Sequence, residues 1–122
     1  HDLPEARTTD LHKMAQKYLN GAEGAEKAGR GQADSLDDPL GKFLSRVFSE
    51  VHGKDSREAL IVSDADRLDC LLQALEYGAC GFPTDEWVKN SKSSLETESA
   101  RAIAKAAISR NPYTWWEGLT VT

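Results

Sequence analysis

The side chain best suited to nucleophilic chemistry is Cys80, which lies in the loop GACGFP. A thiolate forms most readily when a nearby histidine takes the proton, and a fold could bring His12 or His52 to this position. Cys80 also follows an expected helix C-terminus, whose partial negative charge opposes a thiolate. A small enzyme with a Cys80 nucleophile and a spatially adjacent histidine is therefore our alternative hypothesis, and we lean towards a protein that is not an enzyme.

Two sets of residues contain donor atoms for metal ions. Cys70, Cys80, His12 and His52 could supply a zinc site, but the sequence has neither a CxxC nor an HxxxH spacing. The stretch SDADRLD is rich in carboxylates, but a calcium loop needs a glycine at the sixth position, where the sequence has Asp69. We therefore expect no metal and no cofactor, and we expect both cysteines to be buried free thiols.

Aromatic residues gather near the end of the chain, in NPYTWWEG. Trp and Tyr are the residue types that most often anchor protein interfaces, and they also close the ends of helical bundles. We expect both uses here, with Tyr113 and Trp116 facing outward. The predicted partner-binding residues combine these aromatics with one further tryptophan and an acidic helix, and they are Tyr113, Trp115, Trp116, Trp87, Asp64, Asp69 and Glu76.

The charge balance restricts the class of partner. The chain has 20 acidic and 15 basic residues and a formal net charge of −5, which argues against nucleic acid because phosphate binding needs clustered cations. No apolar run approaches the roughly 18 residues of a membrane span. We therefore expect the partner to be another protein, and a basic surface on it would be compatible with this charge. We favour the cytoplasm over secretion as the location.

The first third of the chain contains one expected helix and one expected linker. Over residues 9–20, Leu11, Met14, Ala15 and Tyr18 recur at helical spacing and predict an amphipathic helix. Residues 21–36 carry four glycines and few large apolar side chains. Because each glycine costs about 1 kcal/mol relative to alanine in a helix, we expect a flexible Gly/Ala-rich linker here.

Residues 37–122 form the expected helical core. The clearest helix ends at Gly53 and carries a stripe of six apolar residues: Leu40, Phe43, Leu44, Val47, Phe48 and Val51. A short helix over 59–62, a second helix capped by Ser63, a helix begun by Thr84 and a last helix capped by Ser93 follow.

These elements predict an all-α protein, a compact bundle of five to six helices that forms a single domain over 1–122. The catalytic motifs that we searched for are missing, whereas the core is clear. We therefore predict a non-enzymatic protein-binding domain, such as an inhibitor, an immunity or antitoxin-type protein, an adaptor or an effector module. The second alternative, beside the Cys80 enzyme, is a structural subunit of a larger assembly.

Overall fold

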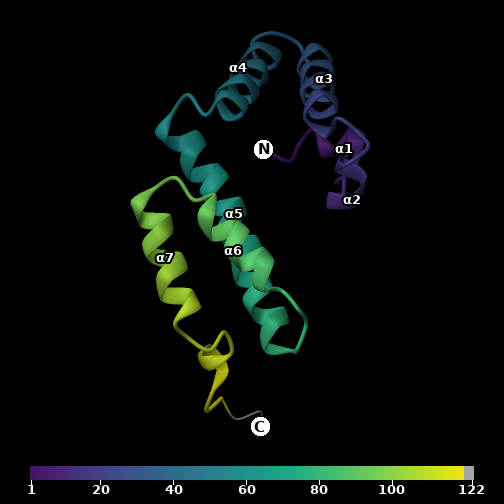
Figure 1. Ribbon diagram of the computed structural model, residues 1–122. Helices are drawn as coiled ribbons and strands as arrows, with labels where there is room; N and C mark the ends of the chain where they lie inside the picture. Colours follow the sequence, from purple (N-terminus) through teal and green to yellow (C-terminus); the bar gives the residue numbers. More distant parts are fainter. Residues whose placement is uncertain (120–122) are drawn as a thin grey trace. The chain divides into compact units, whose positions relative to one another are not determined.

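The computed structural model describes residues 1–119, and all of its regular elements are helices (Figure 1). Helices make up 69% of it, and the described residues contain no strand, which confirms the all-α prediction. The number of helices in this part of the chain is slightly higher than predicted. In chain order they are α1 (Glu5–Thr8), α2 (Lys13–Gln16), α3 (Gly21–Asp34), α4 (Leu40–Gly53), α5 (Arg57–Ala79), α6 (Asp85–Ser93), α7 (Glu98–Ile108) and the 3-10 helix η1 (Thr114–Trp116).

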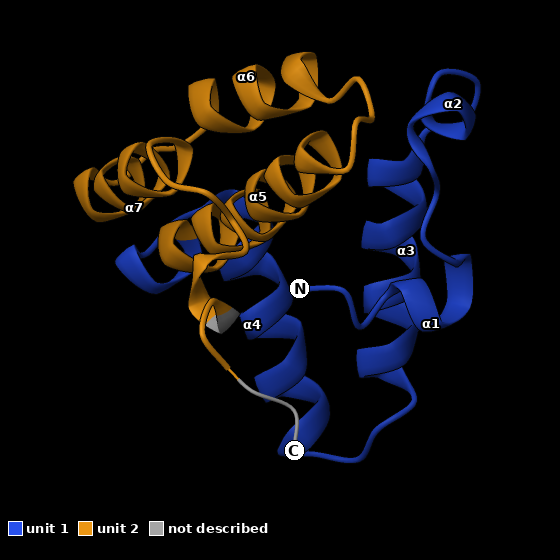
Figure 2. Cartoon of the chain, turned by 90° about the horizontal axis from the view of Figure 1, so that it is seen from below, with its two compact units in different colours: residues 1–59 blue, residues 60–122 orange. Residues whose placement is uncertain are grey.

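The chain divides into two compact units, residues 1–59 and residues 60–122 (Figure 2). The first unit holds α1 to α4, and the second holds α6, α7 and η1. Helix α5 begins in the first unit and continues through the second. That residues 1–122 form a single domain stays a prediction.

The first unit is organised around a close approach of α3 and α4. The buried residues of these helices are small: Gly29 and Ala33 on α3 and Gly41 on α4. A Cβ atom placed on Gly41 would lie 2.6 Å from the carbonyl oxygen of Ala33, so the first turn of α4 rests directly on the backbone at the end of α3. The N-terminal segment is tied to α3 by Gln32, whose Nε2 donates to the carbonyl oxygen of Leu3 at 2.8 Å.

The predicted helix over residues 9–20 is wrong in extent. Only Lys13–Gln16 are helical, and His12 caps this single turn by accepting a hydrogen bond from the Ala15 amide at 3.2 Å. Met14 and Tyr18, which we expected on a buried face, are exposed. The apolar spacing was present, but the exposed side chains gain too little burial to extend the helix beyond one turn.

The predicted linker over residues 21–36 is also wrong, because Gly21–Asp34 form the helix α3. Asn20 caps this helix with its side-chain oxygen, which accepts from the Glu23 amide at 3.3 Å. The glycine penalties are real, but Gly29 and Ala33 lie on the face of α3 that packs against α4. Small side chains permit this close packing, which offsets the cost in helix propensity.

Helix α4 agrees with its predicted position, and Lys54 ends it in the left-handed conformation. The predicted burial of its apolar stripe is only partly right, because Leu40 and Phe43 are exposed while Val47 and Phe48 are half-buried. The region after it differs from the prediction of two helices, since α5 runs without a break from Arg57 to Ala79.

The second unit has a small three-helix core. Leu71 of α5, Leu95 before α7, and Ala100 and Ala104 of α7 are buried together. Val88 of α6 is among the partly buried residues that complete this cluster, and α6 and α7 both lie beside α5 (Figure 1). Small side chains at Ala100 and Ala104 suit close packing of α7 within this cluster, whereas Ile103 on the same helix is exposed.

Two caps in this unit differ from those predicted. Thr97, and not Ser93, caps α7, with its Oγ1 accepting from the Ala100 amide at 3.2 Å. Thr84 precedes α6 as expected, but its hydroxyl donates to the carbonyl oxygen of Ala74 on α5 at 2.7 Å. Both threonines therefore serve contacts that join helices of the unit.

Candidate functional site

The most fully buried polar group in the described part of the chain is the carboxylate of Asp64, which is 2% exposed. Its Oδ1 accepts from the Glu96 amide at 2.9 Å, and its Oδ2 accepts from the amide and the hydroxyl of Thr97, each at 2.7 Å. Asp64 thus fastens the loop before α7 onto α5. This corrects the prediction that Asp64 contacts a partner, because a buried carboxylate with its acceptor sites occupied is not available at the surface.

Arg67 completes this clamp one turn further along α5. Its Nη1 donates to the carbonyl oxygen of Ser94 at 2.6 Å and to Oε1 of Glu96 at 2.9 Å. Burial by itself would raise the pKa of Asp64, but the hydrogen bonds from Glu96 and Thr97, aided by the Arg67 charge, lower that pKa below its usual range. Asp64 is therefore ionised at neutral pH and acts as a structural acceptor.

A second polar cluster joins the C-terminal segment to the end of α5. The Tyr113 hydroxyl donates to the carbonyl oxygen of Glu76 at 3.0 Å and lies 3.0 Å from Sγ of Cys80. The hydrogen bond to Cys80, together with desolvation, raises the pKa of Tyr113. Both cysteines are free, as predicted, but Cys80 is exposed and not buried.

The predicted Cys–His combinations are not formed within either unit, because Cys80 lies in the second unit and His12 and His52 lie in the first. His12 is engaged as the cap of α2, and His52 is exposed in the last turn of α4. The Cys80 thiol instead contacts the phenol of Tyr113, which is a poor general base at neutral pH.

The predicted aromatic residues are largely on the surface. Trp115 is 72% exposed and Trp87 is 51% exposed, whereas Tyr113 is half-buried by its contacts with α5. The Tyr113 hydroxyl bonds to α5 while part of the side chain stays in solvent, so its role in partner binding stays a prediction. The side chain of Trp116 lies outside the described part of the structure. Asp69 and Glu76 are exposed on α5, as a partner-binding role requires.

Sequence reasoning gave too little weight to an aromatic pair at the end of α5. Tyr77 and Phe82 meet edge to face with ring centroids 6.0 Å apart, and both are more than half exposed. The signal was available in YGACGF, where two aromatics bracket a glycine-containing turn. That turn brings the rings together because the Phe82 amide bonds back to the carbonyl oxygen of Tyr77.

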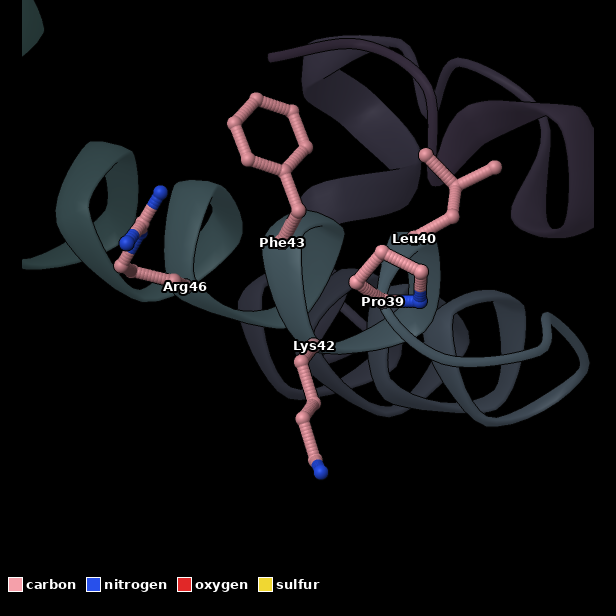
Figure 3. A pocket seen from close by; sticks show the side chains of 5 residues that line it. All are labelled: Pro39, Leu40, Lys42, Phe43 and Arg46. Atoms are coloured by element: carbon pink, nitrogen blue, oxygen red, sulfur yellow. The ribbon is translucent and has the colours of Figure 1, made fainter.

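A shallow pocket of about 540 Å³ lies on α4 and is lined by Pro39, Leu40, Lys42, Phe43 and Arg46. Leu40 and Phe43 point to the same side of the helix, whereas Lys42 points away from them (Figure 3). The Lys42 ammonium pairs with Asp38 at 2.6 Å, and Arg46 lies over the Phe43 ring. Because all of the lining residues come from one short stretch at the start of α4, the pocket is an open depression. Its lining does not bring reactive groups from different elements together.

His1 and Asp2, which precede α1, form a further candidate pair that our sequence reasoning missed. Nε2 of His1 lies 2.8 Å from Oδ1 of Asp2, and both side chains are exposed. An imidazole and a carboxylate in contact can move protons or bind a metal ion. The signal was the adjacency of the two residues, which a search for CxxC or HxxxH spacing does not detect.

The described residues also bear on whether the chain could hold a metal ion. Among the described residues, no three His, Cys, Asp or Glu side chains come close enough to hold an ion together. His1 and Asp2 have suitable donor chemistry but supply two ligands, whereas protein zinc sites use three or four. Within residues 1–119, the His1–Asp2 pair therefore falls short of a full set of zinc ligands.

Comparison with known proteins places the chain in a family. The family model described as HD domain matches residues 1–107. The chain belongs to the HD domain family. The match begins at His1-Asp2, which reads HD in one-letter code, and covers all of α1 to α6 and most of α7. An all-α structure is what this family has, and no curated protein and no solved structure matches the chain.

No helix of the described HD domain combines the length and the apolar character needed to cross a membrane.

Proposed function

We propose that this HD domain takes part in the hydrolysis of phosphate esters. HD-type domains are often metal-dependent phosphohydrolases, and the family match extends over most of the chain. The observation that carries the proposal is the His1–Asp2 pair, with its 2.8 Å contact, at the first matched position. In the described residues it is a contact of imidazole and carboxylate at the surface, where a substrate can reach it.

The proposal concerns the class of reaction and not a metal-centred mechanism. The described residues offer no set of three ligands, so no reaction step is assigned to a bound ion. What the chain itself provides is a carboxylate that orients an imidazole, which in turn can transfer a proton as a general acid or base. The buried Asp64 clamp lies in the other unit and supports the fold.

The test is hydrolysis of a chromogenic phosphate monoester by the full chain, measured with and without added Mg²⁺, Mn²⁺ or Zn²⁺. We expect Asp2→Asn to lower the rate about a hundredfold, since loss of a positioned acid–base group has effects of this size. Asp34→Asn is the matched control, because it removes one exposed carboxylate of the same unit. Hydrolysis that is absent, or that is equal in the two variants, would refute the proposal.

Protein binding is a second candidate function, and the exposed aromatics around the end of α5 are the observation that favours it. Tyr77, Phe82 and Trp115 each leave more than half of their surface in solvent. Exposed aromatic groups of this kind are typical anchors of protein interfaces. The described surface favours none of the narrower roles, such as inhibitor, immunity protein, adaptor or structural subunit.

A further inference from the structure

The outer face of α5 is the surface from which a partner can be inferred. We define the α5 outer face by Asp69, Gln73, Glu76, Tyr77 and Cys80, which are all exposed. At about 100° per residue these positions share one side of the helix, opposite the buried Leu71. The face spans about three turns, or roughly 17 Å.

The charges on this face have one sign. From Leu68 to Cys80 the charged residues of α5 and its end are Asp69 and Glu76, with no lysine or arginine between them. Arg67, the cation next to this stretch, is held by Ser94 and Glu96. An approaching cation therefore meets carboxylates that α5 itself does not neutralise.

The C-terminal end of the same face is aromatic. Tyr77 lies on the face and packs edge to face against Phe82. Tyr113 fixes the segment that carries Trp115 to this end of α5, through its bonds with Glu76 and Cys80. Carboxylates along the helix thus lead to a group of exposed rings.

We propose that the α5 outer face binds a basic amphipathic helix of another protein. The cations of that helix would pair with the Asp69 and Glu76 carboxylates, and one of its apolar side chains would pack against Tyr77 and Phe82. Charge complementarity selects this occupant, because phosphates of a nucleic acid would be repelled by the same carboxylates. The inference rests on the protein-binding candidate function. It does not depend on hydrolysis, which uses His1 and Asp2 in the other unit.

The experiment uses a fluorescently labelled helical peptide with arginines at the spacing of Asp69 and Glu76 and a leucine at its end. Fluorescence anisotropy with the full chain should give saturable binding that weakens as salt is added. A peptide with glutamates in place of the arginines should not bind. Equal binding of the two peptides, or binding of neither, would overturn the proposal while leaving the phosphate-ester assay unaffected.

Variants locate the binding on the α5 outer face. The double variant Asp69→Asn/Glu76→Gln should raise the dissociation constant for the arginine peptide roughly tenfold, as expected for the loss of two exposed ion pairs. The double variant Asp34→Asn/Glu58→Gln changes the net charge equally, from −5 to −3 (two acidic residues removed), and should bind like the wild type. Equal losses in the two double variants would show a general charge effect and overturn the proposed location.

The aromatic end has its own control. Phe82→Ala should weaken binding, whereas Tyr18→Ala, which removes a ring that is 75% exposed in the first unit, should not. Far-UV circular dichroism of each variant establishes that the helices remain. An unchanged affinity in Phe82→Ala would overturn the aromatic part of the proposal.

Discussion

At the scale of single residues, Asp64 is the side chain with the clearest structural role. Aspartate is rarely buried unless it is paired, and here three donors from the loop before α7 surround it. Two of these donors are backbone amides, at Glu96 and Thr97, that precede the first full turn of α7. The carboxylate therefore does for α7, from a distance in the sequence, what a local capping residue does for its own helix.

We expect Asp64→Asn to lower the free energy of unfolding by about 2–3 kcal/mol at pH 7, since charge-assisted bonds are lost and an amide group faces two amide donors. Urea unfolding measures this change. Asp69→Asn is the control, because Asp69 is exposed on the same helix, and its change should stay within about 0.5 kcal/mol. Equal effects of the two substitutions would contradict the structural role of Asp64.

The same residue gives stability a defined pH dependence. Folding lowers the pKa of Asp64 from 3.8, so its contribution is complete above that pH and is lost as the pH falls through the lower folded value. The difference between wild type and Asp64→Asn should therefore shrink on acidification below about pH 4. A difference that stays constant down to strong acid would contradict this origin.

At the scale of elements, the packing of α3 and α4 explains why a glycine-rich segment is helical. An isolated helix with four glycines is unfavourable, and tertiary contacts supply most of the stability of such a helix. The contact is close at Gly41, where the nearest atoms to a new Cβ are backbone oxygens of Ala33 and Leu36, at 2.6 and 2.8 Å. Backbone atoms at a helix end move less readily than the tip of a side chain, so glycine is required at this position.

A matched pair of substitutions tests this element. Gly41→Ala should cost about 1–3 kcal/mol through overpacking against backbone. At Gly31, by contrast, a Cβ meets Nη1 of Arg7, the tip of a flexible side chain. Gly31→Ala should therefore stabilise α3 by up to about 1 kcal/mol through helix propensity.

The midpoint of denaturant unfolding measures both changes. A similar shift in Gly41→Ala and Gly31→Ala would mean that the contact between α3 and α4 does not decide the cost.

At the scale of the whole molecule, the two units differ in what they bury. The buried core of the second unit includes Leu71 and Leu95 with alanines of α7. In the first unit the buried apolar residues include Ala33 and Ala59, which remove much less apolar area from water. Stability is therefore expected to be uneven along the chain.

Native-state hydrogen exchange of the full chain tests this expectation. Amides of α5 near Leu71 and of α7 near Ala104 should exchange roughly tenfold or more slowly than those of α2 and α3, after correction for intrinsic rates. Equal protection in the two units would mean that they open together as one cooperative domain.

Local patterns in the sequence were enough for the fold class and for some helices. The all-α class follows from recurrent apolar spacing and the lack of paired strand signals. Helix α4 follows from its periodicity, and α6 follows from the threonine that precedes it. These features depend on neighbours within one or two turns, so a reader of the sequence can see them. Asp69 and Glu76, expected on an acidic helix, are exposed on α5.

The tertiary structure decided what depends on contacts between distant residues. Asp64 is bonded to residues 32 and 33 positions later, and Tyr113 reaches back 37 and 33 positions to Glu76 and Cys80. The helical state of α3 likewise depends on its packing against α4. Periodicity and capping rules describe short-range energies, whereas burial and long-range hydrogen bonds arise only once the helices are packed. For this reason Asp64 is part of a buried clamp and not an exposed contact, and residues 21–36 are largely a helix and not a linker.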